Sequence, residues 1–243
     1  MKNVLKVLLF VALLCYNEIQ AQYVYVEYSV VSNFDFGQNT PSGINKQEYM
    51  PYIQKFEKAS ELLNEMTMHL KANKTKSVYW GENKMSSDYN PELYTIAKIM
   101  LHSDDKYYID LKTNTISKWF NMMGQNFIET TSINDLKWEM TNESKDINGF
   151  LCYKAITNYT VKNEVGEFEK SVEAWYSPTI PFRFGPKTFA GLPGLILELK
   201  DDKITYFAKN IILKKEDVEI EQIPKGKHIT QEELNQALRK FHR

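Results

Sequence analysis

GPKTFAGLPGLILE, at residues 185–198, is the stretch that decides how this chain folds. It holds three of the 10 glycines and two of the 8 prolines, and it ends in a strand-like apolar tract. Glycine allows positive φ and close approach between backbones, whereas proline fixes φ and removes an N–H donor. The pattern therefore predicts a rigid corner that directs a strand at residues 195–199 into a core. Nothing in this stretch matches a nucleophile, a metal-ligand set or a phosphate-binding loop.

The residues around this corner predict many short strands and a few helices. Val, Tyr, Ile and Phe gather in short runs between polar turns, which is typical of β-structure. Apolar residues at three- and four-residue steps predict helices at residues 46–63 and 92–101, and a T-x-x-E capping box predicts a third at 230–242. We expect strands at residues 23–31, 106–111, 115–120, 126–133, 137–140, 150–161, 167–176, 195–199 and 204–213, with a hairpin at 66–80.

Regular strand spacing indicates the fold class. We expect an α+β fold that is mostly β: a curved antiparallel sheet, half-barrel-like, with one or two covering helices and a C-terminal helix. Residues 22–243 show no repeat and no break in composition, so we expect one β-rich domain there.

The first 21 residues are typical of a secretory signal peptide. Lys2 and Lys6 give a positive start, and residues 7–14 form an apolar run too short to span a bilayer. Ala21 is the expected last residue of the signal. Cys15 fits lipid attachment poorly because a leucine precedes it, so we assign it to the discarded segment. We expect export to the periplasm or the outer-membrane periphery, without a transmembrane helix in the mature chain.

Charge and cysteine content limit the function classes. Removal of residues 1–21 leaves 28 basic and 30 acidic residues, a net charge of −2. This balance argues against a nucleic-acid partner, which needs a clustered basic surface. Cys152 is the one cysteine left, so no internal disulfide is expected. Its apolar neighbours favour a buried thiol over a nucleophile, which needs a nearby base and an electropositive setting.

The sequence carries none of the common catalytic motifs. It has no G-x-S-x-G elbow, no phosphate-binding P-loop and no G-x-G-x-x-G fingerprint. Two adjacent acidic pairs, Asp104 with Asp105 and Asp201 with Asp202, fall at expected turns, and we interpret them as solvated rather than as acid–base pairs. The histidines lack paired metal-ligand spacing, so no metal or other cofactor is expected, although a site assembled from distant residues stays open. They are His69, His102, His228 and His242.

Aromatic residues and prolines gather around the corner. The rings could pack the corner between strands, or they could line an apolar cleft that suits a lipid, an acyl chain or an extended peptide. Arg183 lies between two rings, and we favour a structural role for it over a role as an anchor for an anion. The candidate residues for binding a ligand or partner are Trp175, Tyr176, Phe182, Arg183, Phe184, Phe189, Leu192 and Pro193.

Three segments together resemble the GLPGLI (Porph_ging-type) family of exported proteins from Bacteroidetes-type bacteria. They are INGFLCYKA at 147–155, AWYSPTIP at 174–181 and the corner itself, whose residues 191–196 are the naming motif letter for letter. The resemblance is strongest over residues 137–213. It implies a secretion signal and a location facing the periplasm or outer membrane, and it carries no established activity and no catalytic residues. Family members encoded near TonB-dependent outer-membrane receptors imply a role in uptake or envelope assembly. The strand–corner–strand order also looks like that of lipoprotein carriers of the LolA/LolB type, by analogy of fold only.

These observations favour a non-enzymatic protein of the cell envelope. It would hold an apolar ligand or a segment of a protein partner, or it would dock on an outer-membrane receptor. One alternative is a hydrolase that uses Cys152 or a scattered set of His and Asp residues. The other is a structural accessory subunit without any ligand.

Overall fold

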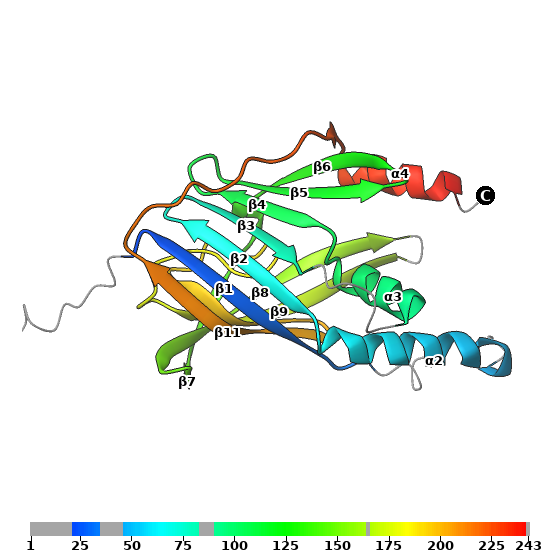
Figure 1. Ribbon diagram of the computed structural model, residues 1–243, viewed down its shortest axis with the longest axis horizontal. Helices are drawn as coiled ribbons and strands as arrows, with labels where there is room; N and C mark the ends of the chain where they lie inside the picture. Colours follow the sequence, from blue (N-terminus) through cyan, green and yellow to red (C-terminus); the bar gives the residue numbers. More distant parts are fainter. Residues whose placement is uncertain (1–20, 35–45, 83–89, 164–165, 242–243) are drawn as a thin grey trace, which may run out of the picture.

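One large open sheet dominates the computed structural model, which describes residues 21–34, 46–82, 90–163 and 166–241. The sheet has 12 strands in the order β12-β6-β5-β4-β3-β2-β1-β11-β10-β9-β8-β7 (Figure 1). The fold is therefore mostly β, as the sequence predicts. The predicted signal peptide lies outside the described residues, apart from Ala21. The strands are β1 (Tyr23–Ser32), β2 (Thr67–Asn73), β3 (Lys76–Gly81), β4 (Lys106–Asp110), β5 (Thr115–Met122), β6 (Gln125–Ser132), β7 (Glu139–Ile147), β8 (Phe150–Asn163), β9 (Gly166–Ser177), β10 (Leu195–Asp201), β11 (Ile204–Lys214) and β12 (Lys227–His228).

β1 lies in the middle of the sheet although it comes first among the described strands. It pairs antiparallel with β2 on one side and with β11 on the other, where Tyr23 lies opposite Lys214. The sheet thus consists of two meanders, β2 to β6 and β7 to β11, joined through β1. Alternate side chains of β1 point to one face of the sheet and are almost fully buried; these are Val24, Val26, Tyr28 and Val30.

Two local features differ from the sequence-based expectation. The strand predicted at 137–140 instead begins at Glu139 and runs to Ile147, after a short 3₁₀ helix, η2 (Ile133–Asp135). β7 is an edge strand whose side chains are mostly exposed and polar, so it lacks the alternation that signals a strand. β12 pairs in parallel with β6, which makes the sheet mixed rather than purely antiparallel. It has two residues and leaves no signal in the sequence.

The three α-helices of the described residues agree with their predicted ranges to within about a residue. They are α2 (Lys46–Leu63), α3 (Pro91–Leu101) and α4 (Gln231–Phe241). Asn90 caps α3 by accepting hydrogen bonds from the backbone N–H groups of Glu92 and Leu93. α2 and α3 pack together at one end of the sheet, and α4 lies near β5 and β6 (Figure 1). No helix within the described residues combines the length and the apolar character that crossing a bilayer requires.

The glycine-rich corner packs as closely as its composition predicts. A Cβ at Gly194 would clash with the backbone of Ser177 and would lie 2.8 Å from the nitrogen of Pro178. Backbone hydrogen bonds of 3.0 Å tie the start of β10 to the segment before the corner, from the N–H of Leu195 to the carbonyl of Ile180 and from that of Ile196 to Phe184. The corner is therefore a rigid element that fixes where β10 begins.

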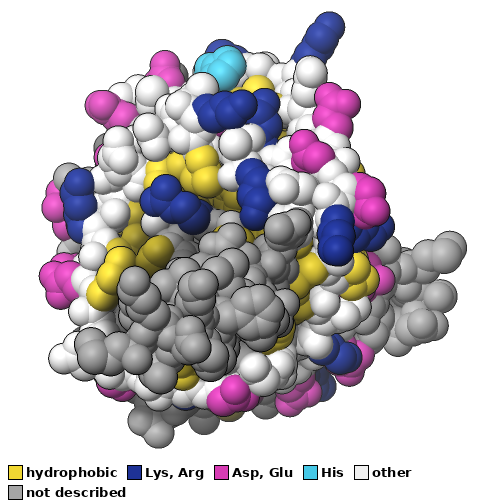
Figure 2. All heavy atoms as spheres, turned by 90° about the vertical axis from the view of Figure 1, so that its left-hand side faces the viewer, with side chains coloured by type: hydrophobic (Ala, Val, Ile, Leu, Met, Phe, Trp, Pro, Cys, Tyr) yellow, Lys and Arg dark blue, Asp and Glu magenta, His cyan; other side chains and the backbone are white. Residues whose placement is uncertain are grey.

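The two faces of the sheet are covered differently. The inner face, which carries residues such as Val26, Leu70, Ala174 and Tyr206, holds the main hydrophobic core. The outer face carries a smaller cluster of Tyr23, Val78, Tyr108 and Ile220, the last from the segment that follows β11. At the end of the molecule where β1 begins, basic and acidic side chains are interspersed (Figure 2), in keeping with a formal net charge of −1.

Candidate functional site

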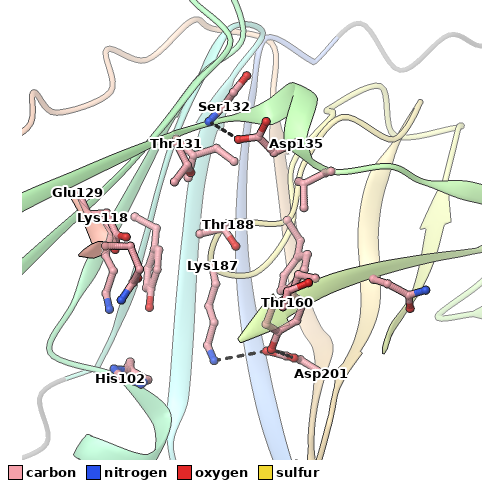
Figure 3. Close-up of a pocket in the computed structure, with 17 residues that line it drawn as sticks. His102, Lys118, Glu129, Thr131, Ser132, Asp135, Thr160, Lys187, Thr188 and Asp201 are labelled. Atoms are coloured by element: carbon pink, nitrogen blue, oxygen red, sulfur yellow. Dashed lines mark hydrogen bonds and ion pairs between the residues drawn. The ribbon is translucent and has the colours of Figure 1, made fainter. Parts of the chain in front are cut away.

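A cavity of about 520 Å³ opens on the inner face of the sheet. β4, β5 and β6 supply one wall, and β8, the end of β10 and the corner supply the other (Figure 3). Because β3, β2, β1 and β11 lie between these walls in the strand order, the sheet must bend around the cavity. The volume is typical of small-molecule sites, which span roughly 300–1,000 Å³. Polar residues that line the cavity include Lys118, Glu129, Tyr159, Thr160, Lys187 and Asp201.

Strand register places Lys118 at the centre of the first wall. It lies opposite Tyr107 on β4 and opposite Glu129 on β6, so all three side chains share the inner face. Its Nζ lies 3.0 Å from Oδ2 of Asp105, and Nδ1 of His102 lies 3.3 Å from the same oxygen. Burial raises the pKa of Asp105, but the contacts with His102 and Lys118 outweigh this effect and hold that pKa below its usual value.

The second wall is built on Lys187, which reaches into the cavity from the corner (Figure 3). Its backbone has φ 52°, in the left-handed region. Its Nζ lies 3.8 Å from Oδ2 of Asp201 and 5.3 Å from the centre of the Tyr206 ring. Tyr159 donates a 2.8 Å hydrogen bond to Oδ1 of Asp201. A chain of Lys187, Asp201 and Tyr159 thus joins the corner, β10 and β8.

Two charged groups of opposite sign in this cavity have spare bonding capacity. At 3.8 Å, Lys187 and Asp201 form an ion pair longer than a hydrogen bond. Burial lowers the pKa of Lys187, against the opposing effect of Asp201. Burial also raises the pKa of Glu129, which Lys118 partly opposes. Among the described residues, none forms a hydrogen bond to the Glu129 carboxylate. Both groups can therefore take a ligand as a partner.

The aromatic residues predicted to bind a ligand lie mostly in the closed core. Of the eight candidates, only Phe189 lines the cavity. Arg183 is exposed and donates a 2.8 Å hydrogen bond to the carbonyl oxygen of Gly191, which agrees with the structural role favoured for it. Pro193 is exposed at the corner. The buried ones are Trp175, Tyr176, Phe182, Phe184, Phe189 and Leu192, each at most 7% exposed.

The adjacent acidic pairs divide in a way that the sequence did not predict. Asp105 and Asp201 turn inward, with side chains only 14% and 13% exposed, whereas Asp104 and Asp202 are the more exposed members at 59% and 42%. The interpretation of Asp105 and Asp201 as solvated turn residues is therefore wrong. Tertiary packing decides which member of each pair is buried, because each turn borders the cavity on one side only.

Cys152 is a buried thiol, as predicted. It has no exposed surface, and its Sγ lies 3.4 Å from the carbonyl oxygen of Phe150. Burial raises its pKa to about 11, so the sulfur stays protonated at neutral pH. Separately, no group of three or more His, Cys, Asp or Glu side chains in the described ranges is arranged to hold a metal ion.

Sequence reasoning missed the residues of the cavity because they are scattered. Lys118, Glu129, Tyr159 and Asp201 come from four different strands, and no local spacing connects them. One signal was present: Lys187 is the sole charged residue between Gly185 and Leu197, inside the corner. A charge held in a rigid, largely buried turn is unusual enough to indicate a site.

The corner and β8 also carry the likeness to known proteins. The model of the family Porph_ging, described as a protein of unknown function, matches residues 159–198. This match is consistent with the resemblance indicated by the GLPGLI motif. The match contains Tyr159, Thr160 and Lys187 of the cavity, as well as the whole corner. No curated protein matches the chain.

Solved structures with a similar fold come from a protein named PNGF-II. Its structure in the C2 space group matches with a TM-score of 0.52 and 14% identity, covering 90% of this chain and 32% of that one. Its structure in the P21 space group matches with a TM-score of 0.53 and 13% identity, covering 90% of this chain and 34% of that one. This chain thus spans about a third of the length of those structures. At such low identity the likeness concerns the fold alone.

Proposed function

We propose that this protein binds a small polar ligand, or a polar segment of a partner, in the inner-face cavity, and that it makes and breaks no bonds. One observation carries the proposal: a cavity of ligand size presents Glu129 and Lys187, each partly desolvated and each with spare bonding capacity. Apolar side chains such as Tyr107, Ile116 and Phe189 complete the lining. A mostly apolar wall with a few convergent polar groups is typical of binding sites.

The cavity favours a polar occupant over the apolar ligand expected from the sequence. The rings assigned to an apolar cleft pack inside the core, so they offer little surface to a lipid or acyl chain. The open, concave sheet is the property that the proposal shares with lipoprotein-carrier half-barrels, and that likeness stays an analogy.

The hydrolase alternative depends on a reactive Cys152. A protonated, fully buried thiol is a poor nucleophile, which argues for binding instead. Labelling with a thiol reagent at pH 8 tests this point: we expect no modification of the native protein and complete modification in urea. Rapid labelling of the native chain would restore the hydrolase alternative. An accessory subunit without a ligand would leave the charged cavity without a role.

Ligand-observed NMR tests the binding proposal. The probes are small amines, carboxylates and polyols, with dodecanoate as the apolar probe. We expect polar probes to bind, and we expect Glu129→Gln or Lys187→Met to weaken their binding at least tenfold. Lys145→Met, which alters an ion pair with Glu198 outside the cavity, should change it less than twofold. Binding of dodecanoate alone would contradict the proposal, as would binding of polar probes that neither cavity variant weakens.

The proposed location is outside the cytoplasm, in the periplasm or at the outer-membrane periphery. The positive start and the short apolar run of residues 1–21 support it. Sequencing of the N-terminus of protein isolated from the envelope fraction tests it, with Gln22 as the expected first residue. An outer-membrane receptor as a partner is part of the same proposal, and recovery of the full-length chain from the cytoplasm would contradict both.

A further inference from the structure

The edge of β8 beside the cavity has no neighbouring strand among the described residues. β7 pairs with β8 only as far as Ile156, which lies opposite Glu139, whereas β9 continues along β8 to Asn163. From Thr157 onward, the described part of the chain therefore pairs with β8 on one side only. Unpaired strand edges present backbone N–H and C=O groups to any chain that can add a strand.

The orientation of these backbone groups follows from the hairpin between β7 and β8. Asn148 and Gly149 have φ 54° and 81°, as in a two-residue type I′ turn, so Phe150 exchanges backbone hydrogen bonds with Ile147. The carbonyl oxygen of Lys154 likewise faces β7, where it accepts a bond from Thr141. Because the direction alternates along a strand without bulges, Asn158 and Thr160 point their N–H and C=O groups to the open edge. Neither backbone bonds to a described residue on that side.

Two cavities lie along this same edge. Asn158, Tyr159 and Thr160 line the inner-face cavity, and Tyr159, Thr160 and Val161 line a second one of about 780 Å³. Three consecutive residues can border one cavity only if the strand edge itself lies against it, because successive side chains alternate between faces. The far side of the second cavity is α4, which presents Gln231, Glu232, Asn235 and Gln236. The open edge thus forms the floor of a groove between the sheet and α4.

We propose that an extended peptide segment of a partner adds to β8 as a strand at Thr157–Val161 and directs a basic side chain into the inner-face cavity. The proposal rests on the function proposed above and names its ligand. Main-chain hydrogen bonds to Asn158 and Thr160 supply affinity, and the cavity supplies specificity, as in other cases of strand addition. The cavity is lined by two lysines and three carboxylates. Because one of these carboxylates, Glu129, has no hydrogen-bond partner among the described residues, a basic side chain suits the cavity best.

Hydrogen exchange of the free chain gives a first test. The amides of Thr157 and Tyr159 bond to β9, so we expect them to exchange at least tenfold more slowly than those of Asn158 and Thr160. Equal protection of all four amides would mean that the edge is already covered, and it would overturn the proposal.

Peptide binding gives the decisive test. Random heptapeptides displayed on phage are selected on the purified chain, and the enriched sequences are measured by fluorescence anisotropy. We expect one position to favour Lys or Arg. We expect Thr160→Pro, which removes an outward N–H at an exposed edge, to weaken binding at least tenfold, and Thr160→Val, which keeps it, to change binding less than twofold.

Changes to the peptide keep the test independent of protein folding. N-methylation of the peptide amides that face β8 should abolish binding, and N-methylation of the alternate amides should not. Replacing the basic residue of the peptide by norleucine should weaken binding as much as Glu129→Gln does. Making both changes together should weaken binding no further.

Failure of this inference is distinguishable from failure of the proposed function. No enrichment of peptides, or indifference to N-methylation, overturns strand addition. If small polar probes still bind in the NMR experiment and remain sensitive to Glu129→Gln, the binding function stands without the peptide. If neither peptides nor small probes bind, both proposals fall.

Discussion

At the scale of single residues, a hydrogen bond decides whether a buried hydroxyl group stabilises the fold. Tyr28 is fully buried and donates a 2.7 Å hydrogen bond to the carbonyl oxygen of Ile196. Tyr206 is equally buried, but its hydroxyl has no hydrogen-bond partner among the described residues. Buried polar groups are normally satisfied, so the Tyr206 hydroxyl costs stability, whereas that of Tyr28 contributes to it.

We therefore expect opposite results from two matched substitutions. Tyr28→Phe should lower the free energy of unfolding by about 1–2 kcal/mol, because it leaves the carbonyl of Ile196 unpaired. Tyr206→Phe should be neutral or stabilising, because it removes a hydroxyl without a partner and keeps the ring beneath Lys187. Urea unfolding measures both. A larger loss for Tyr206→Phe than for Tyr28→Phe would show that water or a ligand satisfies the Tyr206 hydroxyl.

The raised pKa of Glu129 should make the stability of the protein depend on pH. Its pKa in the folded protein is raised above 4.5, so the folded state binds more protons than the unfolded state just above that pH. Stability contributed by this group is thus present below pH 4.5 and is lost as the pH rises through the folded pKa. Glu129→Gln should remove that loss and raise the thermal midpoint at pH 7, by about 2–4 °C if the effect is 1 kcal/mol. Glu57→Gln, on an exposed helix position, is the control. A lower midpoint for Glu129→Gln would contradict this account.

At the scale of elements, the corner tolerates little change in side-chain size, because its backbone packs closely against neighbouring backbone. It positions Lys187 on one side and starts β10 on the other, so its geometry fixes half of the cavity. Its predicted rigidity came from glycine and proline content, and the close backbone contact at Gly194 is the physical cause.

Gly194→Ala should be among the most damaging single substitutions in this protein. Its Cβ would meet the backbone of Ser177 and Pro178, which cannot move aside as a side chain would. We expect a loss of more than about 3 kcal/mol or failure to fold, as for other severe overpacking. Gly124→Ala has open space around it and should cost only about 1–2 kcal/mol for its positive φ of 79°. Chemical denaturation compares the two, and equal losses would show that space is not the cause.

At the scale of the whole molecule, the open sheet is complete only when distant parts of the chain pair. β1 cannot complete its pairing until β11 is available, because Tyr23 lies opposite Lys214. The cavity likewise requires both meanders, since its two walls belong to opposite ones.

Folding should therefore be slow. Non-local strand pairing loses chain entropy, because long loops must close before the stabilising contacts form. Such topologies fold in milliseconds to seconds. We expect the main refolding phase at roughly a second or slower in stopped-flow tryptophan fluorescence, after double-jump experiments separate proline isomerisation. A sub-millisecond main phase would indicate that local hairpins, rather than the pairing of β1 with β11, limit folding.

The sequence by itself determined the helices, most strands, the mostly β class and the corner, and it indicated the family, because each depends on local signals. Runs of strand-forming residues between polar turns gave β1 and β8, three- and four-residue spacing gave α2 and α3, and glycine with proline gave the corner. Only the tertiary structure decided which side chains share a cavity. Lys118, Glu129, Lys187 and Asp201 meet because β1 joins two meanders and the sheet bends. The tertiary structure also decided that the aromatic residues in and beside the corner pack into the core.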